Sequence, residues 1–256
     1  MIYSLLIHLF FLTAGFIFYK KNRIVLSGYL FLIAATGSLI WTNNLAVLTA
    51  VVVMFVFSTW ATRYREKDKA SVHERLAESG PRSWKQGFAN LGPACLLALG
   101  SYLSGEIGFI HGAFASIAAA AADTFASEIG VLSKKQPYFI LSRKEVPPGI
   151  SGGITFLGMT ASAAGAALIA LTHFCFLEDL FVAVMIVGLG ILGSMIDSII
   201  GELYQALYVN RTGDWVERSG GIEKVKGIQW MTNNIVNLIT TTSIGIIGYI
   251  LASICL

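Results

Sequence analysis

A short acidic pattern occurs twice in the second half of the chain. Each copy has an aspartate, a hydroxyl residue, two variable residues, a small residue, a glutamate and an aliphatic residue: Asp123–Ile129 in the first and Asp197–Leu203 in the second. Each copy follows an apolar segment, so its carboxylates are expected at membrane depth, where an ionised group is costly and by default marks a functional site. Two copies in the same orientation indicate a pair related by an approximate twofold axis. Shared helix-end chemistry is the alternative explanation.

Four carboxylates that converge on one point require a cation, and these residue types favour Mg²⁺. The predicted metal ligands are Asp123, Glu128, Asp197 and Glu202, and the two aspartates are also the predicted catalytic centre. Mg²⁺ takes hard oxygen ligands, which here include the Thr124 or Ser198 hydroxyl, water and the phosphates of a substrate. Residues five apart on an ideal helix, however, point about 140° away from each other. The alternative is that only the aspartates face the site, while the glutamates pair with cations from loops.

A long loop after the first acidic copy, residues 129–153, has the composition of a phosphate site. Its predicted catalytic cations are Lys134, Arg143 and Lys144, and its predicted cofactor-binding residues are Lys135, Gly149, Ser151, Gly152 and Gly153. The glycines let the backbone approach a ligand closely, and the segment opens into the next apolar stretch, so free amides and the positive end of a helix dipole could bind an anion. The segment is neither a Walker A motif nor a dinucleotide fingerprint. A plain turn into a helix would explain it equally well.

A second loop, residues 203–232, leads into a cluster of asparagines at the start of the last apolar segment. Asn233 and Asn237 are four apart and share one helix face, with Asn234 beside them. Asparagines in such a position either join helices by hydrogen bonds or bind a metal, a base or a phosphate. We predict that these three bind the cofactor, with the structural role as the open alternative.

Eight apolar segments must position these residues. They cover residues 2–19, 24–40, 45–62, 87–104, 107–122, 154–174, 180–197 and 234–254, and a helix needs roughly 20 residues to cross a bilayer. If successive segments cross the bilayer in opposite directions, all 18 Lys and Arg residues lie on the same side of it. Basic loops stay in the cytoplasm, so both termini are expected outside. The predicted fold is an all-α, polytopic transmembrane bundle of about eight spans.

The composition excludes a soluble globular protein. The chain has 256 residues, of which 55% are apolar, and its mean hydropathy is +0.69. The net charge of +3 is no nucleic-acid signature, because the basic residues lie in loops that the bilayer already explains. We divide the chain into a three-span hydrophobic module (1–62), a charged cytoplasmic linker (63–86) and a five-span catalytic core (87–256) with cytoplasmic loops 129–153 and 203–232.

Several motifs, in the same order, resemble one integral-membrane family. These motifs are Ala122–Gly130, Pro148–Gly153, Asp197–Glu202 and Asn233–Asn237. They are similar to the family catalogued as domain of unknown function ninety-two, which includes the plant phytyl-phosphate kinase, and the likeness covers most of residues 84–256. The resemblance implies conversion of an isoprenyl monophosphate to its diphosphate. The segment Asp123–Ser127 also resembles the acidic motif of CTP-using polyprenol kinases and phosphatidate cytidylyltransferases, which favours nucleotide chemistry by analogy.

Two function hypotheses follow from these observations. The first is a membrane-embedded, phytyl-like isoprenyl-phosphate kinase that uses Mg²⁺ and a nucleoside triphosphate (CTP or ATP). It would act on an isoprenyl monophosphate lipid of the bilayer from the cytoplasmic face, at the plasma membrane if the chain is bacterial. The second is an ion-coupled transporter that uses the same intramembrane acids. The acids gather near one face and not at the midplane, which favours the first.

Overall fold

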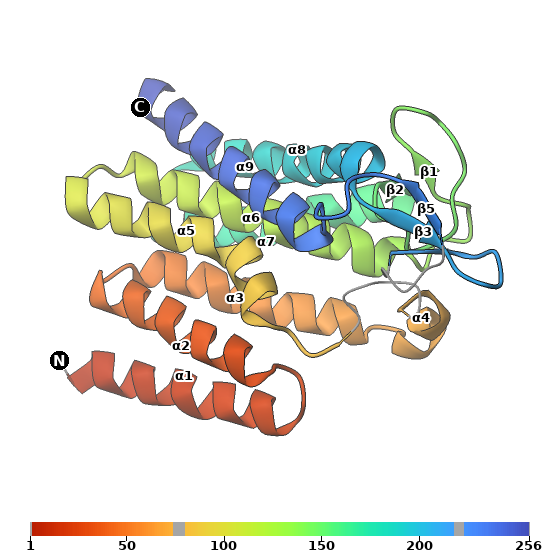
Figure 1. Ribbon diagram of the computed structural model, residues 1–256. Helices are drawn as coiled ribbons and strands as arrows, with labels where there is room; N and C mark the ends of the chain where they lie inside the picture. The colour runs from red at the N-terminus through yellow and green to blue at the C-terminus, as the bar shows by residue number, and fades with distance from the viewer. Residues whose placement is uncertain (1, 74–79, 218–222, 256) are drawn as a thin grey trace.

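The protein is a bundle of helices with short strands at one end (Figure 1), in a computed structural model that describes residues 2–73, 80–217 and 223–255. The helices are α1 (Ile2–Lys20), α2 (Leu26–Trp41), α3 (Leu45–Arg63), α4 (Glu66–His73), α5 (Trp84–Ser104), α6 (Gly108–Gly130), α7 (Phe156–Leu177), α8 (Leu180–Tyr204) and α9 (Asn233–Cys255). The predicted helical class is confirmed. Residues 74–79 of the predicted linker and 218–222 of the second predicted loop lie outside the described residues.

The strands all lie at the end of the bundle that also carries α4 (Figure 1). They are β1 (Tyr138–Phe139), β2 (Gly153–Ile154), β3 (Leu207–Val209), β4 (Trp215–Val216) and β5 (Glu223–Lys226). β1 and β2 form an antiparallel pair, and β3 lies between β4 and β5 in a second antiparallel sheet. The two predicted loops therefore fold into small sheets beside the helix ends that carry the acidic residues.

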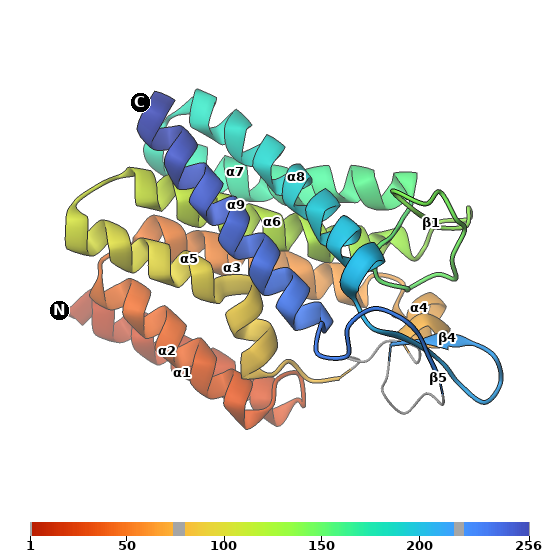
Figure 2. The same cartoon turned by 45° about the horizontal axis from the view of Figure 1, so that its top comes forward.

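Among the described residues, five helices are long and apolar enough to cross a membrane: α3, α6, α7, α8 and α9. Helices α1 and α2 are apolar but shorter within the described region. Helix α5 has the length but begins with polar residues and contains Pro93. The start of α1 and the end of α9 lie at the end of the bundle opposite the strands (Figure 2). This arrangement positions every loop with a predicted functional residue at the same end.

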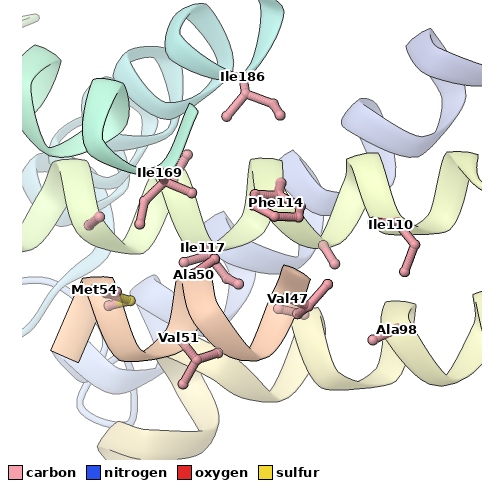
Figure 3. Packing of buried hydrophobic residues seen from close by; sticks show 14 of the residues in the cluster. Val47, Ala50, Val51, Met54, Ala98, Ile110, Phe114, Ile117, Ile169 and Ile186 are labelled. Atoms are coloured by element: carbon pink, nitrogen blue, oxygen red, sulfur yellow. The ribbon is translucent and has the colours of Figure 1, made fainter. Parts of the chain in front are cut away.

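Helix α6 is the centre of the core. Phe114 and Ile117 are fully buried and pack with Val47 and Val51 of α3 and with Ile169 of α7 (Figure 3). Helix α3 therefore shares one core with the C-terminal helices. Small residues let those helices approach closely: a Cβ added at Gly165 of α7 would lie 2.8 Å from the carbonyl oxygen of Ala121.

Candidate active site

The two aspartates of the acidic repeat are brought together by a small-residue contact one helical turn earlier. A Cβ added at Gly193 of α8 would lie only 2.6 Å from the Cβ of Ala119 of α6. Asp197 and Asp123 each stand four residues after these contacting positions, and residues four apart share a helix face. The two carboxylates are close enough for their negative charges to repel each other. The two copies of the acidic pattern therefore occupy matching positions next to the contact between α6 and α8.

Both aspartates line a cavity of about 260 Å³ at the loop end of α6, α7 and α8. Asp197 is buried and accepts a hydrogen bond from the Thr240 hydroxyl of α9 at 3.4 Å. Asp123 is partly buried. The hydroxyls that follow the aspartates both donate back to their own helices, Thr124 to the Ala120 carbonyl at 2.8 Å and Ser198 to the Ser194 carbonyl at 3.1 Å. Both aspartates therefore line the cavity, whereas the two neighbouring hydroxyl hydrogens are used within their own helices.

The first glutamate of the repeat, Glu128, belongs to a buried ion pair. Its Oε2 lies 3.0 Å from the Nζ of Lys69, whose side chain is fully buried, and its Oε1 accepts a hydrogen bond from the Thr62 hydroxyl at 2.9 Å. The Lys69 ammonium also donates to the Ala61 carbonyl at 2.6 Å. Glu128 therefore joins α6 to α3 and α4.

The second glutamate, Glu202, fastens the first loop to the end of α8. Its carboxylate accepts hydrogen bonds from the backbone amides of Leu141 at 2.9 Å and Ser142 at 2.8 Å. Lys226 of β5 donates to the Glu202 carbonyl at 2.6 Å. Burial lowers the pKa of the Lys226 ammonium, and the carboxylates of Glu202 and Glu217 oppose that shift. Glu202 is thus an anchor for two loops.

The expected convergence of all four carboxylates on one cation is corrected by these contacts. Helical geometry turns the glutamates away from the aspartates, as the spacing of five residues allowed. In the described part of the chain, no group of three or more His, Cys, Asp or Glu side chains is arranged to hold a metal ion. Asp123 and Asp197 are left as a pair of carboxylates. Substrate phosphates and water would have to supply the other ligands of a Mg²⁺ ion at this pair.

The predicted cations of the first loop are not at the cavity. Lys134, Lys135, Arg143 and Lys144 are exposed, and none of them belongs to the described lining of the aspartate cavity. The physical reason is the β1–β2 pairing together with Glu202, which holds the turn before Arg143 against α8 and leaves the four side chains in solvent. Their predicted catalytic and binding roles are therefore not supported by this geometry.

The predicted glycine-rich segment does reach the cavity. Gly149, Ser151, Gly152 and Gly153 all line it. Gly152 has φ +88°, and a Cβ there would lie 2.5 Å from the Glu202 amide nitrogen, so both the backbone conformation and the contact with α8 require glycine. The first-turn amide of α7 at Gly158 is already capped by the Thr155 hydroxyl at 3.0 Å. The Gly158 amide is therefore already engaged at the helix end.

Sequence reasoning missed Glu217, which contacts this segment. The Ser151 amide donates to Glu217 Oε1 at 2.8 Å, and Gln205 donates to the Ser151 hydroxyl at 2.9 Å. Glu217 also lines the aspartate cavity. A single glutamate in a loop carries no local signal, because its role depends on a partner 66 residues away. The contact shows that the Ser151 amide donates to an anionic oxygen.

A second cavity of about 300 Å³ lies on the other side of Asp123, between α2, α3, α5, α6 and α9. Both cavities are lined by Gln86, Asp123, Ser127, Val131 and Asn233. The predicted residues Asn234 and Asn237 line the second cavity alone, and Asn237 donates to the side-chain oxygen of Asn90 at 3.2 Å. Asn233 is therefore the predicted asparagine that reaches both cavities, and Asp123 stands where the two meet.

These features define a polytopic helical membrane protein with paired acids at one end of its bundle. The chain belongs to the family of integral membrane proteins DUF92, whose family model matches residues 9–245, and the resemblance of its motifs is thereby confirmed. It is 29% identical over 254 residues to Protein PGR of Arabidopsis thaliana, covering 87% of this chain and 86% of that protein. It is 34% identical over 189 residues to an uncharacterized membrane protein of Methanocaldococcus jannaschii, covering 73% and 67%. No solved structure matches the chain.

Proposed function

We propose that this protein transfers a phosphoryl group from a nucleoside triphosphate, CTP or ATP, to an isoprenyl monophosphate lipid. The observation that carries the proposal is the position of Asp123, opposite Asp197 and at the junction of two cavities. A two-substrate reaction needs two binding spaces that meet at the reacting atoms. An oxygen of the lipid monophosphate attacks the γ-phosphorus, the bond to the β-phosphate oxygen breaks, and a nucleoside diphosphate leaves.

The aspartate pair fits a Mg²⁺ ion. Two nearby carboxylates repel each other in a buried site, and a divalent cation removes that repulsion. Asp123 and Asp197 would hold the ion, and when bound it would neutralise charge on the phosphates of the nucleotide. Thr240 orients Asp197 by its hydrogen bond.

The glycine-rich segment would bind the phosphates of the nucleotide. The Ser151 amide donates to a carboxylate oxygen of Glu217, an anionic group in the position that we assign to a phosphate oxygen. Backbone amides that are fixed before the substrate arrives need no reorganisation during the reaction. Because the acceptor is already an ionised phosphate, the proposal requires no strong general base.

The same proposal includes an orientation in the membrane. We propose eight crossings, with both termini outside and the cavities facing the cytoplasm. The helices that run back and forth in Figure 1 and the basic residues of the loops at one end support this orientation. In a bacterial cell this membrane would be the plasma membrane. The nucleotide would then arrive from the cytoplasm, and the isoprenyl tail would stay in the bilayer.

The test is transfer of label from a γ-³²P nucleoside triphosphate to geranylgeranyl or phytyl monophosphate by the purified protein in detergent. We expect a labelled lipid diphosphate that disappears in EDTA and in the Asp197→Asn variant. Folded protein that labels no isoprenyl phosphate, but carries out proton- or Na⁺-driven flux in liposomes without nucleotide, would replace the kinase with the transporter.

A further inference from the structure

The second cavity contains an arginine that is held in place by its backbone. The Arg82 amide donates to the Arg23 carbonyl at 3.1 Å, and the Arg82 carbonyl accepts from the Val25 amide at 3.1 Å. A Cβ added at Gly28 would lie 2.3 Å from the Arg82 carbonyl oxygen, so α2 packs directly on this backbone. These contacts fix where the Arg82 side chain enters the cavity that it lines.

The Arg82 guanidinium has no protein acceptor among the described residues. Its Cζ lies 5.7 Å from the centre of the Phe55 ring, and its charge interacts with the Glu128 carboxylate without an ion pair at contact distance. Burial lowers the pKa of this guanidinium, because the group is removed from water. A guanidinium has five N–H donors, and leaving them unpaired in a poorly hydrated place is costly. The side chain therefore has the capacity to bind an anion.

Other polar groups of the cavity also keep hydrogen-bonding capacity. The side-chain oxygens of Asn234 and Asn237 are buried, and no donor reaches them within the described chain. The negative charge of Glu128, which also lines this cavity, is compensated by Lys69 at 3.0 Å. An anionic ligand would therefore meet the Arg82 charge without strong repulsion from Glu128.

Part of the wall of this cavity is apolar. It is formed by side chains of α2 and α3 and their surroundings: Phe31, Leu32, Val51, Met54 and Phe55. A cation next to aliphatic and aromatic groups matches a ligand with an anionic head and a hydrocarbon tail. The first cavity has no described arginine or lysine in its lining and is lined instead by the glycine-rich segment.

We propose that the second cavity is the acceptor site, in which Arg82 binds the phosphate monoester of the lipid and α2 and α3 hold the first part of its tail. This assignment rests on the proposed phosphoryl transfer. It places the acceptor phosphate beside Asp123 and leaves the glycine-rich cavity to the nucleotide. It also gives α2 and α3 a role in substrate binding, which the hydropathy of residues 1–62 does not reveal.

The first measurement is steady-state kinetics with geranylgeranyl monophosphate and nucleotide varied in turn. Arg82→Gln should raise KM for the lipid about 10- to 100-fold, the factor expected for losing charge-assisted hydrogen bonds, and leave KM for the nucleotide unchanged. Arg82→Lys should recover part of the loss. Arg23→Gln is the matched control, because Arg23 is exposed and lies beside Arg82 in the backbone pairing. A raised nucleotide KM with an unchanged lipid KM would reverse the assignment of the two cavities.

The tail is tested with a bulky substitution in the apolar wall. Leu32→Trp should raise KM for geranylgeranyl monophosphate but not for dimethylallyl monophosphate, while Leu30→Trp, at an exposed position of the same helix, should change neither. Equal effects on both lipids would contradict a tail between α2 and α3.

Direct binding separates failure of this inference from failure of the kinase. Labelled geranylgeranyl monophosphate is bound to the detergent-solubilised protein without nucleotide, with inorganic phosphate as competitor. Binding that requires Arg82, in a protein that transfers no phosphate, would support the site and refute the kinase. Transfer by the wild type with binding unaffected in Arg82→Gln would refute the site alone. Inorganic phosphate that competes as well as the lipid would leave a phosphate site without a tail site, and overturn the assignment.

Discussion

Neutralising Glu128 tests whether this residue is a structural partner of Lys69 or a metal ligand. Lys69 is fully buried, whereas the side chain of Glu128 is 19% exposed. The ammonium donates to Glu128, Ala61 and Thr62, at 3.0, 2.6 and 3.3 Å. Glu128→Gln leaves this charge buried without its counterion. Breaking such a pair typically costs 3–5 kcal/mol, and the partial exposure of Glu128 places the expected loss near the lower limit, about 3 kcal/mol.

The double variant Lys69→Met/Glu128→Gln separates the lost pair from other effects. It removes the buried charge together with its partner, and replacing a buried ion pair by uncharged groups is often nearly neutral. We therefore expect it to lie within about 1 kcal/mol of the wild type, and so to regain about 2 kcal/mol of the stability that Glu128→Gln loses. Arg65→Gln breaks the exposed pair with Asp68 and should change stability by less than about 1 kcal/mol.

The assay is thermal unfolding in detergent, followed by circular dichroism, with phosphoryl transfer measured well below the lowest midpoint. For a chain of this length, a loss of about 3 kcal/mol corresponds to a decrease in Tm of about 6–12 °C. Turnover of folded Glu128→Gln should stay within a few-fold of the wild type. An unchanged Tm with turnover lost would refute the ion-pair argument and restore Glu128 as a metal ligand. Single and double variants of equal stability would also refute it.

Three further predictions concern the aspartate cavity. Asp123→Asn should lower turnover about 100- to 1,000-fold or more, because it removes a charge beside the reacting phosphates, while Tm falls little; the transfer assay with thermal unfolding checks both. Gly152→Ala should lower stability by about 1–3 kcal/mol through its positive φ and its contact with the Glu202 amide, whereas Gly213→Ala, at φ +85° with nothing within 4 Å, should show the conformational cost alone; unfolding of both measures the difference. Glu217→Gln should lower KM for the nucleotide several-fold, because the Ser151 amide loses a competing anion; a higher KM would show that the carboxylate assists binding.

Local sequence information was sufficient for the helices and for one part of the site. Apolar segments of about 20 residues predicted the main helices, since hydrophobic length depends only on neighbouring residues. The repeat predicted that Asp123 and Asp197 share a site, and both line one cavity. The prediction that Glu128 and Glu202 join them as metal ligands is not supported by their contacts, which favour the alternative drawn from the spacing of five residues. The glycine-rich segment, predicted to bind phosphate, lines the same cavity, and its binding role stays a prediction.

Other parts of the site depend on contacts between distant residues and could not be read from local patterns. Lys134 and Arg143 follow the acidic motif closely, yet strand pairing turns them into solvent. Arg82 stands in a charged linker, where a solvated role was the simpler expectation, and only its pairing with residues 23–25 brings it into a cavity. Similarly, His111 and His173, 62 residues apart, form a buried hydrogen bond of 2.9 Å that no spacing rule indicates.

The acidic repeat assigns different tasks to its two kinds of acid. The aspartates meet because Ala119 and Gly193 allow α6 and α8 to touch one turn earlier. The glutamates, five residues further on, point away and bind the surrounding elements: Glu128 holds α3 and α4, and Glu202 holds the β1–β2 loop. The ion pair of Glu128 with Lys69 thus fixes the wall on the α6 side of the aspartates. The Glu202 carboxylate, which accepts from two loop amides, fixes the wall on the α8 side. Substituting a glutamate should therefore impair the site through stability and loop position, whereas substituting an aspartate should impair the chemistry in a protein that still folds.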